Sequence, residues 1–140
     1  RRNGERKDTS RNIMKRKEFV VHIVDELNVE QINVTAATLK ANESEIEKAK
    51  LTPIPSYLIE TSGIKEAKVR FECVLEKVIE LGTDNEISTD LIIGKIVKMH
   101  FHPSVYNDGK IVYRALNAVS RLAGNDYAKV GEIFTKERSN

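Results

Sequence analysis

The stretch GERKDTSRN near the N-terminus gathers side chains of the kind that bind a small anion. Lys7 offers a point charge, and Arg2 just before the stretch offers a forked donor. Thr9, Ser10 and Asn12 add hydroxyl and amide donors ahead of an apolar run. Such groups, together with free backbone N–H groups at a helix start, can hold a phosphate. The same letters are typical of a capped helix start or of a solvated basic arm. The stretch alone leaves the three readings open.

The charge of the chain is concentrated at the same end. Residues 1–17 hold eight of the 23 Lys and Arg residues but only two of the 21 Asp and Glu residues, although the net charge is only +2. A basic end on a mildly acidic body points to an anionic partner near the N-terminus. A nucleic-acid-binding arm is disfavoured, because aromatic residues make up 6% of the chain and none precedes Phe19. We therefore expect no nucleic-acid partner.

Few other residues are of types that could take part in catalysis or metal binding. Cys73 is the single cysteine, which excludes an internal disulfide and fits a reducing compartment, and its apolar surroundings predict a buried, inert thiol. His100 and His102 would share one face of a strand. A metal site there lacks an evident third ligand, because His22 is distant in the sequence and lies in an apolar strand. We expect no metal.

The apolar patterning predicts a mainly β chain with short helices that place these residues. Asp8, Thr9 and Ser10 are expected to start and cap the first helix, with Asp8 capping it or orienting Lys7. We expect helices over residues 10–16, 26–41 and 43–49, strands over 18–24, 67–81, 90–102, 116–122 and 127–134, and a turn over 82–85.

Several of these elements carry sharper expectations. The strand over residues 18–24 is rich in β-branched and aromatic residues, which predicts burial on both faces. The strand over 67–81 is long, so a bend or bulge is expected. Gly94 is a candidate for a bulge or a close backbone approach. The inward positions expected for the helix over 26–41 are Leu27, Ile32 and Leu39.

Three stretches in this order and spacing resemble the FMN-binding, flavin reductase-like split-barrel family, which includes flavoredoxins and the reductase components of two-component monooxygenases, such as that of nitrilotriacetate monooxygenase. They are GERKDTSRNI followed by EFVVHIV, LTPIPSYLIETSGIKEAKVRFECVLEKVIEL, and AVSRLAGNDYAKVGEIF. The resemblance implies an FMN-binding split β-barrel. It also implies further strands before Arg1, so we expect residues 1–140 to form a single flavin reductase-like domain without its N-terminal part.

The resemblance implies that the first stretch contacts the FMN phosphate, with Lys7, Thr9 and Asn12 at matching positions. It places Arg121, Gly124 and Tyr127 near the flavin or the subunit boundary, with Arg121 able to stabilise negative charge on reduced flavin and Tyr127 able to stack or donate a hydrogen bond. Structural roles for these three remain an alternative. The expected cofactor-binding residues are Arg2, Lys7, Thr9, Ser10, Asn12, Arg121, Gly124 and Tyr127.

The resemblance implies hydride transfer from NADH or NADPH to FMN by a cytoplasmic homodimer, with a monooxygenase as a possible electron acceptor. An FMN-binding electron carrier without its own NAD(P)H activity is the alternative. The catalytic residues are not identified from the sequence, since the flavin carries the chemistry and no acid–base group is required. No apolar run approaches membrane-spanning length, so we expect no membrane partner.

Overall fold

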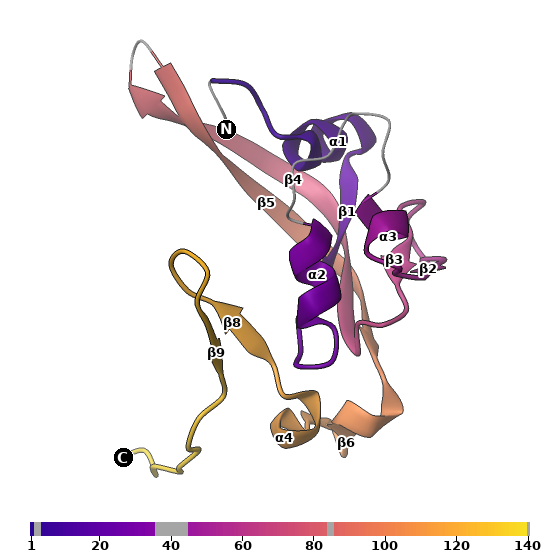
Figure 1. The fold of residues 1–140 in the computed structure, drawn as a ribbon, viewed down its shortest axis with the longest axis vertical. Coiled ribbons are helices and arrows are strands. Elements are labelled where there is room, and N and C mark those ends of the chain that lie inside the picture. The colour runs from indigo at the N-terminus through magenta and orange to yellow at the C-terminus, as the bar shows by residue number, and fades with distance from the viewer. Residues whose placement is uncertain (2–3, 36–44, 84–85, 140) are drawn as a thin grey trace.

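A three-stranded antiparallel sheet is the centre of the fold, seen in a computed structural model that describes residues 1, 4–35, 45–83 and 86–139. The strands, in the order β1-β4-β5, are β1 (Glu18–His22), β4 (Val69–Thr83) and β5 (Glu86–Phe101). β4 and β5 pair along almost their whole length, and the far end of this hairpin projects beyond the helices (Figure 1).

Short elements surround the sheet in the described part of the chain. The paired short strands are β2 (Pro53–Ile54) with β3 (Gly63–Ile64), β6 (Tyr106–Asn107) with β7 (Lys110–Ile111), and β8 (Val119–Arg121) with β9 (Tyr127–Lys129). The helices are α1 (Asp8–Arg16), α2 (Val29–Thr35), α3 (Glu45–Lys48), the 3-10 helix η1 (Pro103–Val105) and α4 (Tyr113–Leu116). The chain is thus mainly β with short helices, as the sequence predicts, and no described helix is long and apolar enough to cross a membrane.

Irregularities in the β4–β5 ladder confirm the expected bulges. The register shifts lie between Glu72 and Cys73, between Leu75 and Lys77, and between Leu81 and Gly82. Gly94 is a true close-approach site: a Cβ built on it would lie 2.4 Å from Cζ of Phe19, an approach that real atoms do not make. The ring of Phe19 therefore packs from β1 across β4 onto the bare backbone of β5.

Two small cores hold these elements together. Val69, Val105 and Leu116 form one buried cluster where η1 and α4 cover the end of β4. The second cluster consists of Ala49, Leu51 and Ile64, with Ile32 of α2 and Ile46 of α3 packed against it. This second core fixes α2, α3 and β3 beside β1. Cys73 is 2% exposed and burial raises the pKa of its thiol, which confirms the expected buried cysteine.

The helix expected over residues 26–41 begins three residues later, at Val29. The carboxylate of Asp25 accepts hydrogen bonds from the N–H groups of Leu27 and Asn28, and this turn delays helix α2 to Val29. Leu27 is consequently 78% exposed rather than inward, whereas Ile32 packs inward as expected. Leu39 lies outside the described residues.

The first strand is also less buried than its composition suggests. β1 ends at His22 and lies at the edge of the sheet, where Val21 is 39% exposed, so the expectation of burial on both faces is wrong. An apolar composition does not by itself reveal which strand takes the edge position.

The boundaries of other elements differ from the expected ones because of the local structure at their ends. The expected strand from residue 116 is shortened to β8 because Leu116 closes α4, and β9 ends at Lys129 rather than at Phe134. Gly82 and Thr83, expected in the turn over 82–85, instead pair with β5. Residues 84–85, like Glu43 and Ser44 of the expected third helix, lie outside the described ranges.

Candidate functional site

Helix α1 presents two chemically different faces. Thr9, Asn12 and Arg16 follow each other at helical spacing and line a hollow beside β1. Ser10 points the other way: it is buried, and its hydroxyl donates to Oδ2 of Asp90 on β5 at 3.0 Å. Of the expected phosphate contacts, the structure thus brings the side chains of Thr9 and Asn12 to the hollow and turns that of Ser10 away. Lys7, at the N-cap of α1, does not line the hollow. Arg2 lies outside the described residues.

The first turn of α1 keeps its backbone donors free. Lys7 is the N-cap residue and makes no side-chain capping bond, so the expected capping by Asp8, Thr9 or Ser10 is wrong. The carboxylate of Asp8 instead pairs with Arg11. The N–H groups of residues 8–10 find no acceptor within the described residues. They form a cluster of unpaired N–H groups at the positive end of a helix, which favours an anion.

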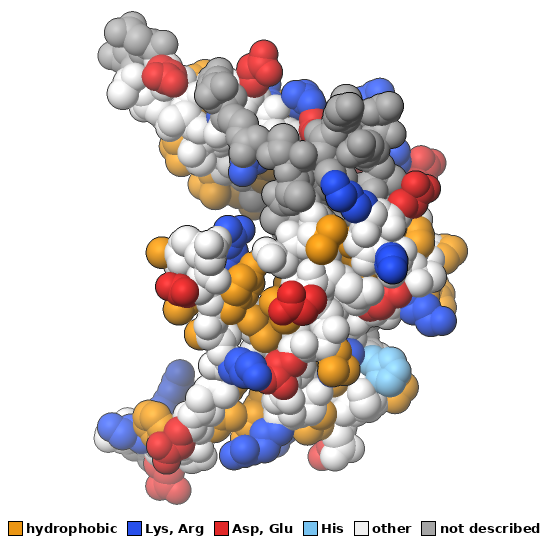
Figure 2. All heavy atoms as spheres, viewed as in Figure 1, with side chains coloured by type: hydrophobic (Ala, Val, Ile, Leu, Met, Phe, Trp, Pro, Cys, Tyr) orange, Lys and Arg blue, Asp and Glu red, His pale blue; other side chains and the backbone are white. Residues whose placement is uncertain are grey.

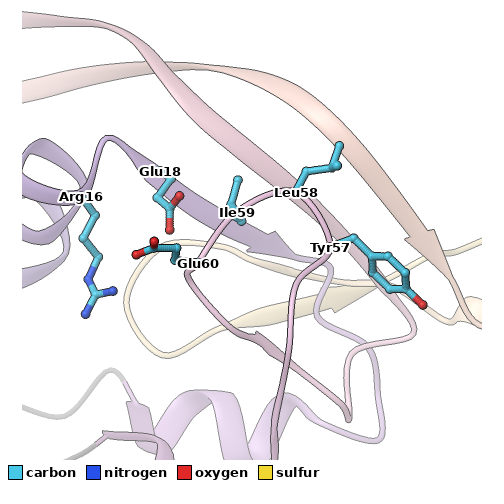
Figure 3. Close-up of a pocket in the computed structure, with 6 residues that line it drawn as sticks. All are labelled: Arg16, Glu18, Tyr57, Leu58, Ile59 and Glu60. Atoms are coloured by element: carbon cyan, nitrogen blue, oxygen red, sulfur yellow. The ribbon is translucent and has the colours of Figure 1, made fainter.

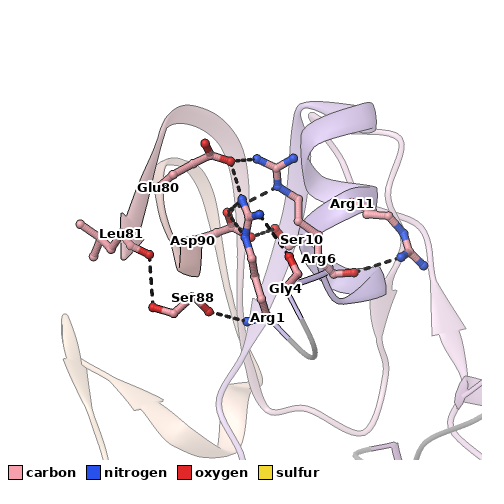
Figure 4. A network of polar contacts seen from close by, with 9 residues as sticks. All are labelled: Arg1, Gly4, Arg6, Ser10, Arg11, Glu80, Leu81, Ser88 and Asp90. Carbon is pink, nitrogen blue, oxygen red and sulfur yellow. Dashed lines mark hydrogen bonds and ion pairs between the residues drawn. The ribbon is translucent and has the colours of Figure 1, made fainter. Parts of the chain in front are cut away.

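Two of the basic residues in the segment 1–17, Arg1 and Arg6, are neutralised by acidic residues of the β4–β5 hairpin. The guanidinium groups of Arg1 and Arg6 both pair with Glu80 and Asp90, which lie directly opposite each other on β4 and β5 (Figure 4). The hydrogen bond between Arg1 and Asp90 raises the pKa of the guanidinium and lowers that of the carboxyl. The two arginines act as a strap across a like-charged pair and do not form a free basic arm.

The hollow beside β1 has a volume of about 1050 Å³. Its polar wall comes from α1, its floor from β1, and its other walls from α2, α3 and the segment 60–64. The residues that line it away from α1 are Glu18, Phe19, Val20, Val21, His22, Ile32, Thr35, Ile46, Leu51, Glu60, Thr61, Ser62 and Ile64. The N-terminal turn of α1 and an apolar floor therefore share one hollow.

A smaller hollow of about 570 Å³ adjoins the first. Arg16, Glu18 and Glu60 line both hollows, and Tyr57, Leu58 and Ile59 complete the smaller one (Figure 3). Arg16 makes no hydrogen bond or ion pair with another described residue. Its charge lies at the boundary of the two hollows and contributes to the lowered pKa of the neighbouring Glu18.

The loop between β2 and β3 is fastened to the sheet by buried acceptors. Both oxygens of Glu72, 1% exposed, accept bonds from the N–H groups of Tyr57 and Leu58, at 2.7 and 2.8 Å, and Nε2 of His100 lies 2.6 Å from Oε1 of Glu72. Burial alone would raise the pKa of Glu72, but these three donors lower it overall. The carboxylate stays ionised and holds the loop.

Two further side chains fasten the same loop nearer the hollow. Oε1 of Glu18 accepts from the N–H and the hydroxyl of Thr61, which lowers the pKa of Glu18 although burial opposes the shift. Nε2 of His22 accepts from the N–H of Ile64 at 2.9 Å. Burial, with Arg70 nearby, lowers the pKa of His22 to about 4.

His100 and His102 do not form a metal site. His100 is engaged with Glu72, and Nδ1 of His102 accepts the N–H of Ser104 at the start of η1. The described residues hold no cluster of three or more metal-ligating side chains.

The C-terminal candidates lie apart from both hollows. Arg121 donates to the carbonyl of Gly124 at 3.2 Å, and Gly124 adopts a positive φ of 63° that closes the β8–β9 turn. The hydroxyl of Tyr127 donates to Oδ1 of Asn33 at 3.1 Å. None of the three lines either hollow within the described part of the chain. The contacts of these three residues are thus within the protein. Exposed hydrophobic side chains surround them near β8 and β9, and hydrophobic side chains are visible on the face of the molecule shown in Figure 2.

Sequence reasoning did not place several residues at the site. Arg16 of α1 and Glu18 and His22 of β1 line the larger hollow, and Glu72 of β4 fastens the loop beside it. The available signal was a carboxylate inside an apolar strand, since a buried Glu needs donors. His22 carried a similar signal, but its backbone partner is 42 positions away in the sequence.

Comparison with known proteins identifies the family. Residues 3–117 match the flavin reductase like domain, and the chain belongs to this family. It is 54% identical, with a TM-score of 0.93, to the crystal structure of nitrilotriacetate monooxygenase component B from Bacillus cereus, over 96% of this chain and 67% of that one.

Two further relatives agree. The uncharacterized protein YwrF of Bacillus subtilis is 49% identical over 96% of this chain and 67% of its own length. A Shewanella frigidimarina structure assigned as a flavin reductase with a split barrel domain has a TM-score of 0.80 at 26% identity, over 94% of this chain and 65% of that one. The chain thus has the split-barrel fold and spans about two thirds of the length of these relatives.

Proposed function

We propose that this protein binds FMN in the hollow beside α1 and acts as an NAD(P)H-dependent flavin reductase. The family and the structure similar to component B of a monooxygenase support the class. One observation carries the proposal: the uncapped N-terminus of α1 lies at a hollow whose floor is apolar.

The phosphate end of FMN fits the first turn of α1. The unpaired N–H groups of residues 8–10, the Thr9 hydroxyl and the Asn12 amide supply neutral donors. Lys7 lies at the N-cap, outside the lining of the hollow, and its side chain would have to turn toward the phosphate to supply charge. Ser10 contributes its backbone N–H, because its hydroxyl is committed to Asp90. The ion pair with Arg11 offsets the negative charge of Asp8, which would otherwise repel a phosphate.

The ring system of FMN fits the remainder of the hollow. Val20, Ile32 and Ile46 offer apolar surface there, which would exclude water from one side of the ring. Bound FMN supplies the hydride acceptor and the onward electron transfer. Arg16 is placed to stabilise developing negative charge, a role that suits it better than Arg121, whose guanidinium contacts Gly124.

Assembly and partners are proposals of the same kind. We infer a cytoplasmic homodimer, in which the exposed apolar side chains around β8 and β9, such as Leu122 and Val130, would be covered. Arg121 and Tyr127 would then lie at or near the subunit boundary. A monooxygenase is the proposed electron acceptor, as the name of the similar component B suggests.

An absorbance spectrum after addition of FMN and removal of the excess tests the proposal. The protein should retain a flavin spectrum, which Lys7→Ala and Thr9→Ala weaken. Lys15→Ala is the matched control, because Lys15 lies in the last turn of the same helix, far from the N-cap residue Lys7. Bleaching of the bound flavin by NADH or NADPH would support a reductase; retained flavin without bleaching would support an electron carrier. No retained or titratable flavin would refute the proposal.

A further inference from the structure

His22 lies at the end of β1 opposite to α1 and lines the larger hollow. It lies four positions after Glu18, where the strand begins after α1, which is a span of about 13 Å along a β-strand. The hollow thus has an anion-binding end at α1 and an imidazole near its other end.

The contact with Ile64 fixes the tautomer of His22. Nε2 accepts the backbone N–H of Ile64 at 2.9 Å, and a ring nitrogen that accepts carries no proton. The neutral ring must therefore carry its proton on Nδ1. Burial and the neighbouring Arg70, which pairs with His22 in the β1–β4 register, keep the ring neutral, with a pKa of about 4.

The Nδ1–H group has no acceptor within the described residues, and the ring is partly buried in the lining of the hollow. The group is therefore available to donate a hydrogen bond to a ligand bound in the hollow. The ring system of a flavin carries carbonyl oxygens and unprotonated nitrogens along one edge, and these are acceptors.

We propose that the Nδ1–H group of His22 donates a hydrogen bond to an acceptor on the edge of the bound flavin ring. The inference rests on the proposed binding of FMN in this hollow. The phosphate at α1 directs the ring toward His22, and a fixed neutral donor strengthens its bond as electron density on the ring rises upon reduction. His22 would be a binding residue that positions the ring and favours its reduced form.

Two substitutions separate this role from the fastening of Ile64. In His22→Gln, the amide oxygen can reach the position of Nε2 and keep the Ile64 contact, but no donor remains at Nδ1. In His22→Asn, the amide can place a donor at the position of Nδ1 but cannot reach Ile64. FMN affinity measured by fluorescence quenching should fall about fivefold or more in His22→Gln and stay within about twofold in His22→Asn.

A second readout uses the unsubstituted protein, which matters if a variant does not fold. The Nδ1 proton of His22, followed by NMR with ¹⁵N-labelled histidine, should shift on addition of FMN. Unchanged affinity in His22→Gln, or an unshifted Nδ1 proton in protein saturated with FMN, would overturn the inference alone. Failure of the unsubstituted protein to bind FMN would overturn the proposed function as well.

Discussion

The hydroxyl of Ser10 donates to the carboxylate of Asp90 at 3.0 Å, which joins helix α1 to the β4–β5 hairpin. Asp90 also receives the guanidinium of Arg1, so the first helix and the N-terminal strap converge on one carboxylate of β5 (Figure 4). The bond orients α1 so that Thr9 and Asn12 line the hollow.

Ser10→Ala should therefore affect stability rather than ligand affinity. Loss of the bond to Asp90 is expected to lower the free energy of unfolding by about 1 kcal/mol. FMN affinity should stay within about twofold, whereas Thr9→Val should lower it about fivefold. Denaturant unfolding and flavin titration of both variants test this. A larger affinity loss in Ser10→Ala than in Thr9→Val would contradict the assignment of the two faces of α1.

Gly94→Ala should be strongly destabilising because the new Cβ would meet the ring of Phe19. Overpacking of this kind costs about 1–3 kcal/mol. The effect should shrink in a Phe19→Leu background, which lacks the colliding ring atoms, and a double-mutant cycle measures the difference. Gly131→Ala is the control, since a Cβ there meets nothing within 4 Å. Equal effects of Gly94→Ala in both backgrounds would exclude the contact as the cause.

The stability of the protein should fall as the pH drops from 6.5 toward 4 because of His22. The pKa of His22 is about 4 in the folded chain against an ordinary value of 6.5, so in this window the unfolded chain binds more protons. Stability from this group is fully present above pH 6.5 and is lost as the pH falls through 4. The shift corresponds to about 3 kcal/mol. In His22→Gln, the free energy of unfolding should depend less on pH between pH 6.5 and 5 than in the unsubstituted protein. The same pH dependence in both proteins would contradict the assignment.

Glu72→Gln should loosen the loop between β2 and β3. The amide group of Gln cannot accept from both Tyr57 and Leu58, so at least one of these N–H groups loses its partner, at a cost of about 1 kcal/mol. Hydrogen exchange of these two amides should accelerate in Glu72→Gln. Glu76→Gln, an exposed position on the same strand, should leave them unchanged. Protected amides in Glu72→Gln would show that the carboxylate does not hold the loop.

Local patterns predicted the elements whose causes are local. The apolar runs predicted the positions of β4 and β5, and the length of β4 predicted the bulges. The glycine at position 94 predicted a close approach, which the ring of Phe19 makes. The start of α2 was misplaced because the side chain of Asp25 builds a turn first, a choice that helix propensity does not register.

The site was harder to predict because its contacts are distant in sequence. The donor-rich stretch located α1, but the sequence could not show that Ser10 faces Asp90, 80 positions away, while Thr9 faces the hollow. It likewise could not show that Arg1 and Arg6 are paired with Glu80. Charge counts describe how many cations a segment has, and only tertiary structure decides which remain available.

The ratio of FMN affinity to riboflavin affinity tests the central claim most directly, because the two ligands differ only in the phosphate. The account predicts that the protein prefers FMN by at least about tenfold. Lys7→Ala and Thr9→Val should reduce this preference by weakening FMN binding alone, while Lys15→Ala preserves it. Equal affinity for the two ligands, or a preference that neither substitution at α1 changes, would contradict the account.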